Sequence, residues 1–161
     1  MPLPKPPTAS QQPPAAWLSL DHQLCFALYA ASLAMTKLYK PLLEPLGLTY
    51  PQYLVMLVLW EGDGLTVSAV GDRLGLDSGT LTPLLKRLES AGLVQRLRDA
   101  ADERRVLLQL TAPGRALKTR AAALPPQVAQ ASGCTLGELS ALRAQLHALR
   151  QQLNEAHSRA A

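Results

Sequence analysis

One stretch decides the fold: VSAVGDRLGLDSGTLTPLLKRLESAG, residues 67–92. Apolar residues at helical spacing predict a short helix over residues 67–74, which Gly75 ends in a tight turn. Asp77 or Ser78 then caps a second helix, whose leucines again recur at spacings of three and four. A short helix, a glycine turn and a longer helix together predict a helix-turn-helix.

The sequence after Gly92 predicts a β-hairpin. Two strand-like runs, residues 93–98 and 106–111, flank a charged loop, residues 99–105. A hairpin directly after a helix-turn-helix makes a winged helix-turn-helix. The expected fold class is therefore mainly α with a small β-hairpin wing.

This unit predicts DNA binding. Its second helix fits the major groove, and the hairpin loop reaches the neighbouring groove, where an arginine suits the negative potential. Charge is modest, because residues 66–115 hold eight Lys/Arg and six Asp/Glu. The alternative is that the unit only packs or docks a protein. The candidate DNA-binding residues are Asp77, Ser78, Gly79, Thr80, Thr82, Lys86, Arg87, Arg96, Arg98, Arg104 and Arg105.

Helical segments flank this unit. Residues 1–16 are a Pro-rich tail that we expect to be disordered. Residues 17–47 and 113–157 are expected to be a helical dimerisation region, and residues 48–112 the winged-helix domain. The last helix carries a seam of leucines that needs a partner helix. Its members are Leu136, Leu139, Leu142, Leu146, Leu149 and Leu153.

The composition excludes several classes of protein. The 161 residues carry a net charge of +4 and suit one domain with helical extensions. The longest apolar run, Tyr53–Trp60, is eight residues, whereas a membrane span needs ~20. The N-terminus also lacks the apolar stretch of a signal peptide, so we expect a cytoplasmic protein without a membrane partner. Two cysteines, Cys25 and Cys134, are too few for a metal cage, and we expect no metal or other cofactor.

The helix-turn-helix and wing resemble those of MarR-type winged-helix regulators. The resemblance lies in SGTLTPLLKRLE (residues 78–89), in GLV (92–94) and in DERR (102–105), and it extends over residues 18–157. It implies an obligate, intertwined homodimer formed by the N- and C-terminal helices, which suits the leucine seam. It also implies a repressor that binds a pseudo-palindromic, double-stranded operator.

Cys25 lies on the first predicted helix, with Tyr29 one turn further on. Tyr39, fourteen residues after Cys25, returns to within ~40° of the same helix face but lies ~21 Å along the axis. Tyr39 therefore cannot touch Cys25 of its own chain. It could touch Cys25 of a partner if two such helices cross antiparallel near Ser32, and Tyr50 at the start of the next helix could join it.

This arrangement resembles the OhrR-like organic hydroperoxide regulators, a branch of the MarR type. There, two tyrosines of the other subunit hydrogen-bond the cysteine, and Cys25, Tyr39 and Tyr50 match that pattern. The resemblance implies redox sensing: oxidation of Cys25 to a sulfenic acid, an intersubunit disulfide with Cys134, and release of the operator. Tyr29 is a third candidate for stabilising the thiol.

Other interpretations stay open. A MarR-type regulator could respond to a small phenolic ligand in the dimer crevice, with Cys25 incidental. A cysteine on an apolar helix face, such as Cys25, is usually inert packing, and Cys134, just before the last helix, could also simply pack. A thiol peroxidase is a further alternative. No CxxC motif, Gly-rich phosphate loop or acid/base cluster supports it, so we do not expect an enzyme.

Overall fold

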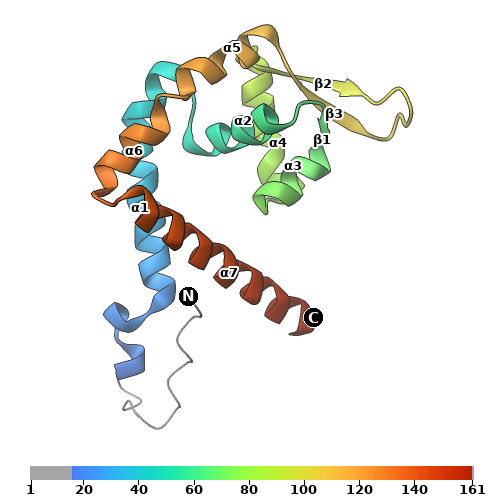
Figure 1. Ribbon diagram of the computed structural model, residues 1–161. Helices are drawn as coiled ribbons and strands as arrows, with labels where there is room; N and C mark the ends of the chain where they lie inside the picture. Colours follow the sequence, from blue (N-terminus) through green and yellow to red (C-terminus); the bar gives the residue numbers. More distant parts are fainter. Residues whose placement is uncertain (1–15, 161) are drawn as a thin grey trace. The chain divides into compact units, whose positions relative to one another are not determined.

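The computed structural model describes residues 16–160 and divides them into two compact units (Figure 1). One unit is Ala34–Leu124, and the other comprises residues 16–33 and 125–160. The Pro-rich tail predicted for residues 1–16 lies outside the described residues, apart from its last position. In chain order the elements are η1 (Ala16–Leu18), η2 (Leu20–His22), α1 (Leu24–Leu43), η3 (Glu44–Leu46), α2 (Tyr50–Glu61), β1 (Leu65–Thr66), α3 (Val67–Leu74), α4 (Ser78–Ser90), β2 (Val94–Arg98), β3 (Val106–Leu110), α5 (Ala112–Ala121), α6 (Leu124–Ser132) and α7 (Leu136–Ala160).

The predicted helix-turn-helix is formed by α3 and α4. Thr66 and Asp77 cap the two helices, each accepting a backbone N–H of the first turn through its side-chain oxygen. Gly75 has φ +68°, a left-handed conformation that favours glycine. The turn is tight, because a Cβ at Gly71 would lie 2.8 Å from the carbonyl oxygen of Leu76.

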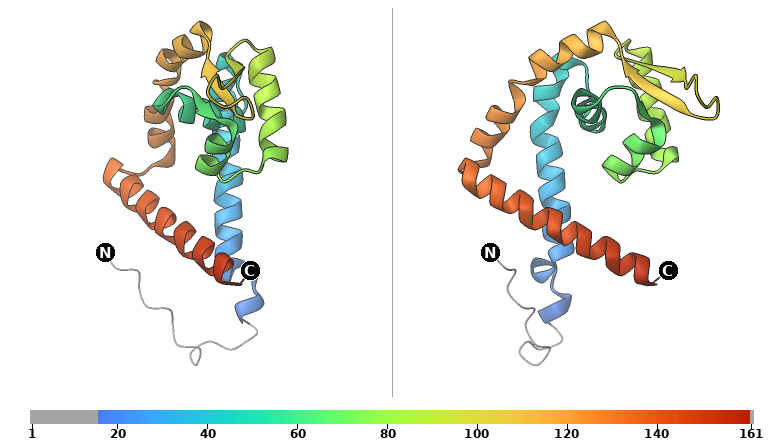
Figure 2. Two further views of the ribbon diagram at one scale, coloured as in Figure 1. Left: turned by 90° about the vertical axis from the view of Figure 1, so that its right-hand side faces the viewer. Right: turned by 45° about the vertical axis from the view of Figure 1, so that its right-hand side comes forward.

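The predicted wing is part of a three-stranded antiparallel sheet in the order β1-β3-β2. β2 and β3 pair along their whole length, and their hairpin extends away from the helices of the same unit (Figure 1; Figure 2, right). The additional strand, β1, pairs with β3. The sequence did not predict it, because a strand of two residues shows no alternating pattern.

The core of this unit lies between α2, α4 and the sheet. Met56 and Leu59 of α2 and Leu81, Leu85 and Leu88 of α4 are each 1% exposed or less. Burying a side chain of this size stabilises a fold by ~1.5–3 kcal/mol. The three leucines therefore hold one face of α4 in the core and leave the opposite face to solvent.

The junction between the wing and α5 is closely packed. A Cβ at Gly114 would lie 2.0 Å from the carbonyl oxygen of Leu93, so only glycine fits there. The indole Nε1 of Trp60 donates to the carbonyl oxygen of Gly114 at 2.9 Å. Lys118 Nζ in turn donates to the carbonyl oxygen of Trp60 at 2.8 Å. The end of α2 is thereby fastened to the start of α5.

The second unit is helical throughout. Residues 17–47 were expected to be helical, but at their start two short 3-10 turns, η1 and η2, precede α1. No residue of α7, which is described in full, is buried. Four leucines of the predicted seam are between 43% and 79% exposed: Leu136, Leu142, Leu146 and Leu153. Most of the seam is therefore exposed to solvent in the described chain, and only Leu139 and Leu149 are partly buried.

No single helix within residues 16–160 is both long and apolar enough to cross a membrane. Leu24–Leu46 and Tyr50–Glu61 meet those requirements only together, as a pair bent by 69°.

Candidate DNA-binding surface and thiol site

The first turn of α4 presents the polar residues expected to face DNA. Asp77 Oδ1 accepts the N–H of Thr80 at 2.8 Å. This hydrogen bond, with a further one from the Thr80 side chain, holds the pKa of Asp77 below its usual range. Ser78, Gly79 and Thr80 are exposed. The predicted N-cap is thus Asp77, and its charge keeps the exposed turn in place.

Further along α4, the polar residues differ in what they contact. The hydroxyl of Thr82 donates to the carbonyl oxygen of Ser78 at 2.6 Å, so its proton is used inside the helix. Lys86 and Arg87 are exposed, and neither forms an ion pair within residues 16–160. These two cations are therefore available to an anionic partner.

The wing arginines fall into two groups. Arg96 lies 2.8 Å from Glu89 of α4, and the hydrogen bond from Arg96 lowers the pKa of Glu89. Arg96 thus ties the hairpin to α4. Arg98 is exposed and makes no ion pair with any described residue. Arg104 lies 3.2 Å from Asp102, yet its side chain is 91% exposed. These positions make Arg98 and Arg104 more accessible than Arg96.

Aspartates order the tip of the wing. Asp99 accepts the N–H of Ala101 at 2.9 Å, and Asp102 accepts the N–H of Arg104 at 3.1 Å. Arg105 lies 3.8 Å from Asp99. A hollow of about 400 Å³ beside this tip is lined by Thr66, Val67, Ser68, Arg104, Arg105 and Val106. Hydroxyls and guanidinium groups on one hollow suit a phosphate.

Both cysteines are free and exposed. Cys25 lies in the first turn of α1, and Cys134 lies in the loop between α6 and α7. The N–H of Cys134 donates to Ser132 Oγ at 3.2 Å, and its thiol lies 3.6 Å from the carbonyl oxygen of the same serine. The two cysteines belong to the same compact unit.

Three tyrosines gather where α1 ends and α2 begins. The ring of Tyr39 lies 5.0 Å from that of Tyr50 and 5.5 Å from that of Tyr53. Desolvation by burial is the main cause that raises the pKa of Tyr39 to about 12, and it also raises the pKa of Tyr50. Both hydroxyls therefore keep their protons at neutral pH and can donate hydrogen bonds.

Not every tyrosine named from the sequence belongs to this cluster. Tyr29 is 62% exposed and makes no ring contact within the described residues. Tyr53, by contrast, belongs to the cluster but was missed. Its signal was its place three residues after Tyr50 in YPQY, one helical turn away on the same face.

A hollow of about 490 Å³ adjoins the tyrosine cluster. Its lining combines Tyr50, Pro51 and Leu48 with the cations Lys37 and Lys40. Thr36, Glu44, Gly47 and Thr49 complete the lining. The lining is thus largely apolar and carries two lysines and one glutamate, which suits an organic molecule.

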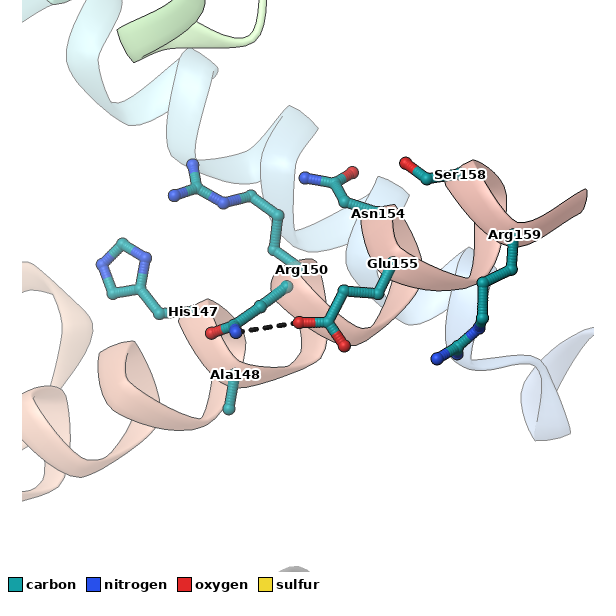
Figure 3. Close-up of a pocket in the computed structure, with 8 residues that line it drawn as sticks. His147, Ala148, Arg150, Asn154, Glu155, Ser158 and Arg159 are labelled. Carbon is teal, nitrogen blue, oxygen red and sulfur yellow. Dashed lines mark hydrogen bonds between the residues drawn. The ribbon is translucent and has the colours of Figure 1, made fainter. Parts of the chain in front are cut away.

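Another hollow, of about 890 Å³, is different in character (Figure 3). Every residue that lines it comes from α7, and most are polar, among them His147, Arg150 and Asn154. Gln151 Nε2 donates to Glu155 Oε1, one helical turn further on, at 2.9 Å (Figure 3). It is one polar side of a helix. Within residues 16–160, no group of His, Cys, Asp and Glu could hold a metal ion.

A family model described as the transcriptional regulator SarA/Rot matches residues 37–120. The HTH-type transcriptional regulator TtmR of Methylorubrum extorquens is 55% identical over 142 residues, which cover 88% of this chain and 71% of the relative. The organic hydroperoxide resistance transcriptional regulator of Bacillus subtilis is 49% identical over 138 residues, 86% of this chain and 94% of the relative. The chain belongs to the SarA/Rot family of transcriptional regulators.

Solved structures place this SarA/Rot regulator among the MarR-type proteins. Reduced AbfR of Staphylococcus epidermidis bound to DNA has a TM-score of 0.70 and 36% identity, covering 84% of this chain and 93% of AbfR. Apo MarR from E. coli has a TM-score of 0.65 and 26% identity, and the match covers 79% of this chain and 96% of MarR. The resemblance to MarR-type, OhrR-like winged-helix regulators is thus confirmed. The chain is a DNA-binding transcriptional regulator, and its relatives here are regulators rather than enzymes.

Proposed function

We propose that this regulator is a repressor that senses organic hydroperoxides by oxidation of Cys25 and then releases its operator. The observation that carries the proposal is the tyrosine cluster, with Tyr39 and Tyr50 ring to ring at 5.0 Å in a chain whose Cys25 is free and exposed. Phenol hydroxyls that donate hydrogen bonds stabilise a thiolate, the reactive form of cysteine. The 49% identity to a Bacillus subtilis organic hydroperoxide regulator supports the same function.

The proposed sensor needs two copies of the chain. Tyr39 lies fourteen positions after Cys25 on α1, a rise of ~21 Å that a side chain cannot cross. A twofold dimer brings each cysteine to the tyrosines of the other copy and makes the contact twice. The exposed leucines of α7 are the surface that such a homodimer would bury.

The chemistry begins with the Cys25 thiolate as the nucleophile. Its sulfur attacks the outer oxygen of the hydroperoxide, an S–O bond forms, and the O–O bond breaks. The alkoxide leaves and takes a proton, so the products are an alcohol and the sulfenic acid of Cys25. The apolar hollow of about 490 Å³ beside Tyr50 favours an organic hydroperoxide over hydrogen peroxide.

Cys134 is the proposed resolving thiol. Its sulfur attacks the sulfenic sulfur of Cys25 in the other subunit, which forms a disulfide and releases water. The exposure of both thiols supports this step. AbfR, a neighbour in structure, has been solved in reduced, overoxidised and disulfide-formed states.

The proposed DNA surface is the exposed face of α4 together with the wing. Ser78, Gly79 and Thr80 would meet base edges or phosphates, while Asp77 holds the turn. Thr82, whose proton is used inside α4, would accept a hydrogen bond from a base edge. Lys86, Arg87, Arg98, Arg104 and Arg105 would neutralise phosphates or enter the minor groove. Arg96 is the least available, since it pairs with Glu89. We expect this binding in the cytoplasm, and a disulfide that moves the two winged helices apart would end it.

The test is oxidation by about one equivalent of cumene hydroperoxide, followed by non-reducing electrophoresis, intact-mass measurement and operator binding. In the wild type we expect a covalent dimer that a reductant converts back to monomer. We expect no such dimer in Cys25→Ser or Cys134→Ser. Operator binding should fall in parallel. An unmodified protein that keeps its operator would contradict hydroperoxide sensing. A stable sulfenic acid without a dimer would contradict only the role of Cys134.

A second candidate is a regulator that binds a small phenolic ligand, with Cys25 incidental. The hollow lined by Tyr50, Lys37 and Lys40 favours it, because a phenol or aromatic acid suits a largely apolar lining with lysines in it. Cys25→Ser separates the two candidates. A ligand-responsive regulator keeps its response in this variant, whereas a hydroperoxide sensor loses it.

A further inference from the structure

An ion pair joins Arg96 of β2 to Glu89 of α4. The Nε and Nη2 atoms of Arg96 lie 3.0 and 2.8 Å from Glu89 Oε2, and the two side chains are 34% and 37% exposed. All of residues 95–109 are described, and within them no other side chain is hydrogen-bonded or ion-paired to a helix. This pair is therefore the one polar side-chain link between the outer part of the hairpin and α4.

The pair lies where the sheet stops being three-stranded. Arg96 is opposite Leu108 of β3, and Leu108 is in turn opposite Leu65 of β1. β1 ends one residue further on, at Thr66, and beyond it only β2 and β3 continue toward the tip (Figure 1). The sheet is thus held by β1 at one edge and by Arg96 at the other, and the free arm of the wing begins at this level.

The accessible arginines of the wing lie on that free arm. Arg98 follows Arg96 on the same face of β2, ~7 Å further along the strand. Arg104 and Arg105 lie in the loop that joins β2 to β3. A small tilt of the hairpin at Arg96 therefore becomes a larger displacement of the groups that the proposed DNA surface requires.

We propose that Arg96 and Glu89 are positioning residues, which hold the wing at the angle to α4 that lets both elements bind DNA together, and that Arg96 itself contacts no phosphate. This inference rests on the proposed DNA surface and not on the oxidation of Cys25. The helix reads the major groove while the wing reaches the neighbouring groove, so the angle between them decides whether both bind at once. A wing that tilts freely is competent for only a fraction of the time, and the apparent affinity falls by that fraction.

The two charges of the pair give the proposal an unusual sign. Removing a negative charge from a DNA-binding surface ordinarily tightens binding, because phosphates are repelled less. Glu89→Ala should instead weaken binding, although it makes the protein more positive. Arg96→Ala should weaken binding by a similar factor, and the double variant by no more, because each residue acts through the other. A partly exposed ion pair shifts an equilibrium by up to about fivefold, so we expect binding by a dimer to weaken roughly two- to tenfold.

The test is fluorescence anisotropy with the full-length reduced protein and two fluorescein-labelled duplexes. The long duplex is one that the wild type selects from a random-sequence pool. The short duplex keeps only the central segment in which the wild type protects guanine N7, a major-groove atom, from methylation. The losses in Glu89→Ala, Arg96→Ala and the double variant should appear on the long duplex and disappear on the short one, which has no flanks for the wing to bind.

Glu103→Ala is the matched control. Glu103 is an exposed acidic residue of the wing tip that makes no ion pair with any described residue. Its removal should leave binding to the long duplex unchanged or tighter. The midpoint of urea unfolding should stay close to wild type in all the variants.

The salt dependence of binding separates positioning from phosphate contact. Removing an arginine that neutralises a phosphate lowers the slope of log K against log salt concentration by about one for each contact. Arg96→Ala should keep the wild-type slope. A lowered slope in this variant, tighter binding by Glu89→Ala, or equal losses on both duplexes would overturn the positioning role. A wild type that binds both duplexes equally would overturn the part of the wing in the proposed DNA surface, and this inference with it.

Discussion

At the scale of single residues, Asp63 connects three parts of the winged helix. Its Oδ1 accepts the N–H of Leu110 at 2.8 Å and that of Gly64 at 2.9 Å, and its Oδ2 lies 2.7 Å from Arg115. Desolvation opposes ionisation of this carboxyl, but the three partners outweigh it, so the pKa of Asp63 is lowered. A single charge thereby holds the turn after α2, the end of β3 and the start of α5.

Asp63→Asn is expected to reduce stability at neutral pH and to change its pH dependence. A carboxyl whose pKa is lowered by folding stabilises the native state above its unfolded pKa, ~3.9, and this contribution is lost as the pH falls through the lower folded value. Urea unfolding should therefore show a gap between wild type and variant at pH 7 that narrows below about pH 4. Glu103→Gln, at an exposed position, is the control. A gap that widens in acid would contradict this role.

Arg104 and Arg105 test the wing at the same scale. If either enters the minor groove, Arg104→Ala or Arg105→Ala should weaken operator binding by ~1–3 kcal/mol. Fluorescence anisotropy at fixed salt concentration measures this, with Arg159→Ala, which removes the same charge from α7, as the control. Unchanged affinity in both variants would remove the wing from the proposed DNA surface.

At the scale of elements, the joint between the wing and α5 sets where the hairpin points. Gly114 lies against the carbonyl of Leu93, and Thr111 Oγ1 both accepts the N–H of Gly114 at 3.1 Å and donates to the carbonyl oxygen of Gly92 at 2.6 Å. The indole N–H of Trp60, at the end of α2, adds a hydrogen bond to the carbonyl oxygen of the same glycine. The turn before β2, the start of α5 and the Trp60 side chain therefore meet at a point where residue 114 has no room for a side chain.

Gly114→Ala is expected to destabilise the fold by at least ~1–3 kcal/mol, the usual effect of overpacking. The new Cβ would meet the Leu93 carbonyl oxygen at 2.0 Å, and backbone cannot move aside as a flexible side chain can. Gly137→Ala is the matched control, since the nearest atom to its Cβ is Thr135 Oγ1 at 4.0 Å. That helical position should instead gain ~0.5–1 kcal/mol. Urea unfolding of both variants checks this, and equal stabilities would contradict it.

At the scale of the whole molecule, the leucines of α7 predict self-association. Exposed leucines repeat along one face of this helix, and no residue of α7 is buried within its chain. A stripe of this kind on a single helix is stabilised by packing against a second helix. The proposed sensor needs the same dimer, because it combines Cys25 of one chain with Tyr39 and Tyr50 of the other.

Leu142→Lys combined with Leu146→Lys should convert the protein to a monomer. The two side chains are 50% and 43% exposed in the single chain, so the charges are tolerated there but disrupt an apolar interface. Light scattering with size-exclusion chromatography measures the mass. Ala144→Lys, about 200° round the helix from Leu142, is the control. A double variant that remains a dimer would show that α7 is not the interface.

Local signals made much of the fold predictable. Helical spacing, the cap at Asp77 and the turn glycine Gly75 act over a few residues, and the structure has these features where they were expected. The hairpin followed in the same way. The seam of leucines and the pair Cys25 and Tyr39 were also visible, because helix geometry converts residue spacing into faces and distances.

By itself, the sequence determined the winged helix and the residue types available for its chemistry. Only the tertiary structure decided that β1 joins the sheet, that Arg96 pairs with Glu89, and that the ring of Tyr53 packs against that of Tyr39. The physical reason is the separation along the chain over which each kind of interaction acts. Capping, turns and periodicity depend on neighbours within a few positions, whereas strand pairing, ion pairs and ring contacts depend on how separate elements pack together.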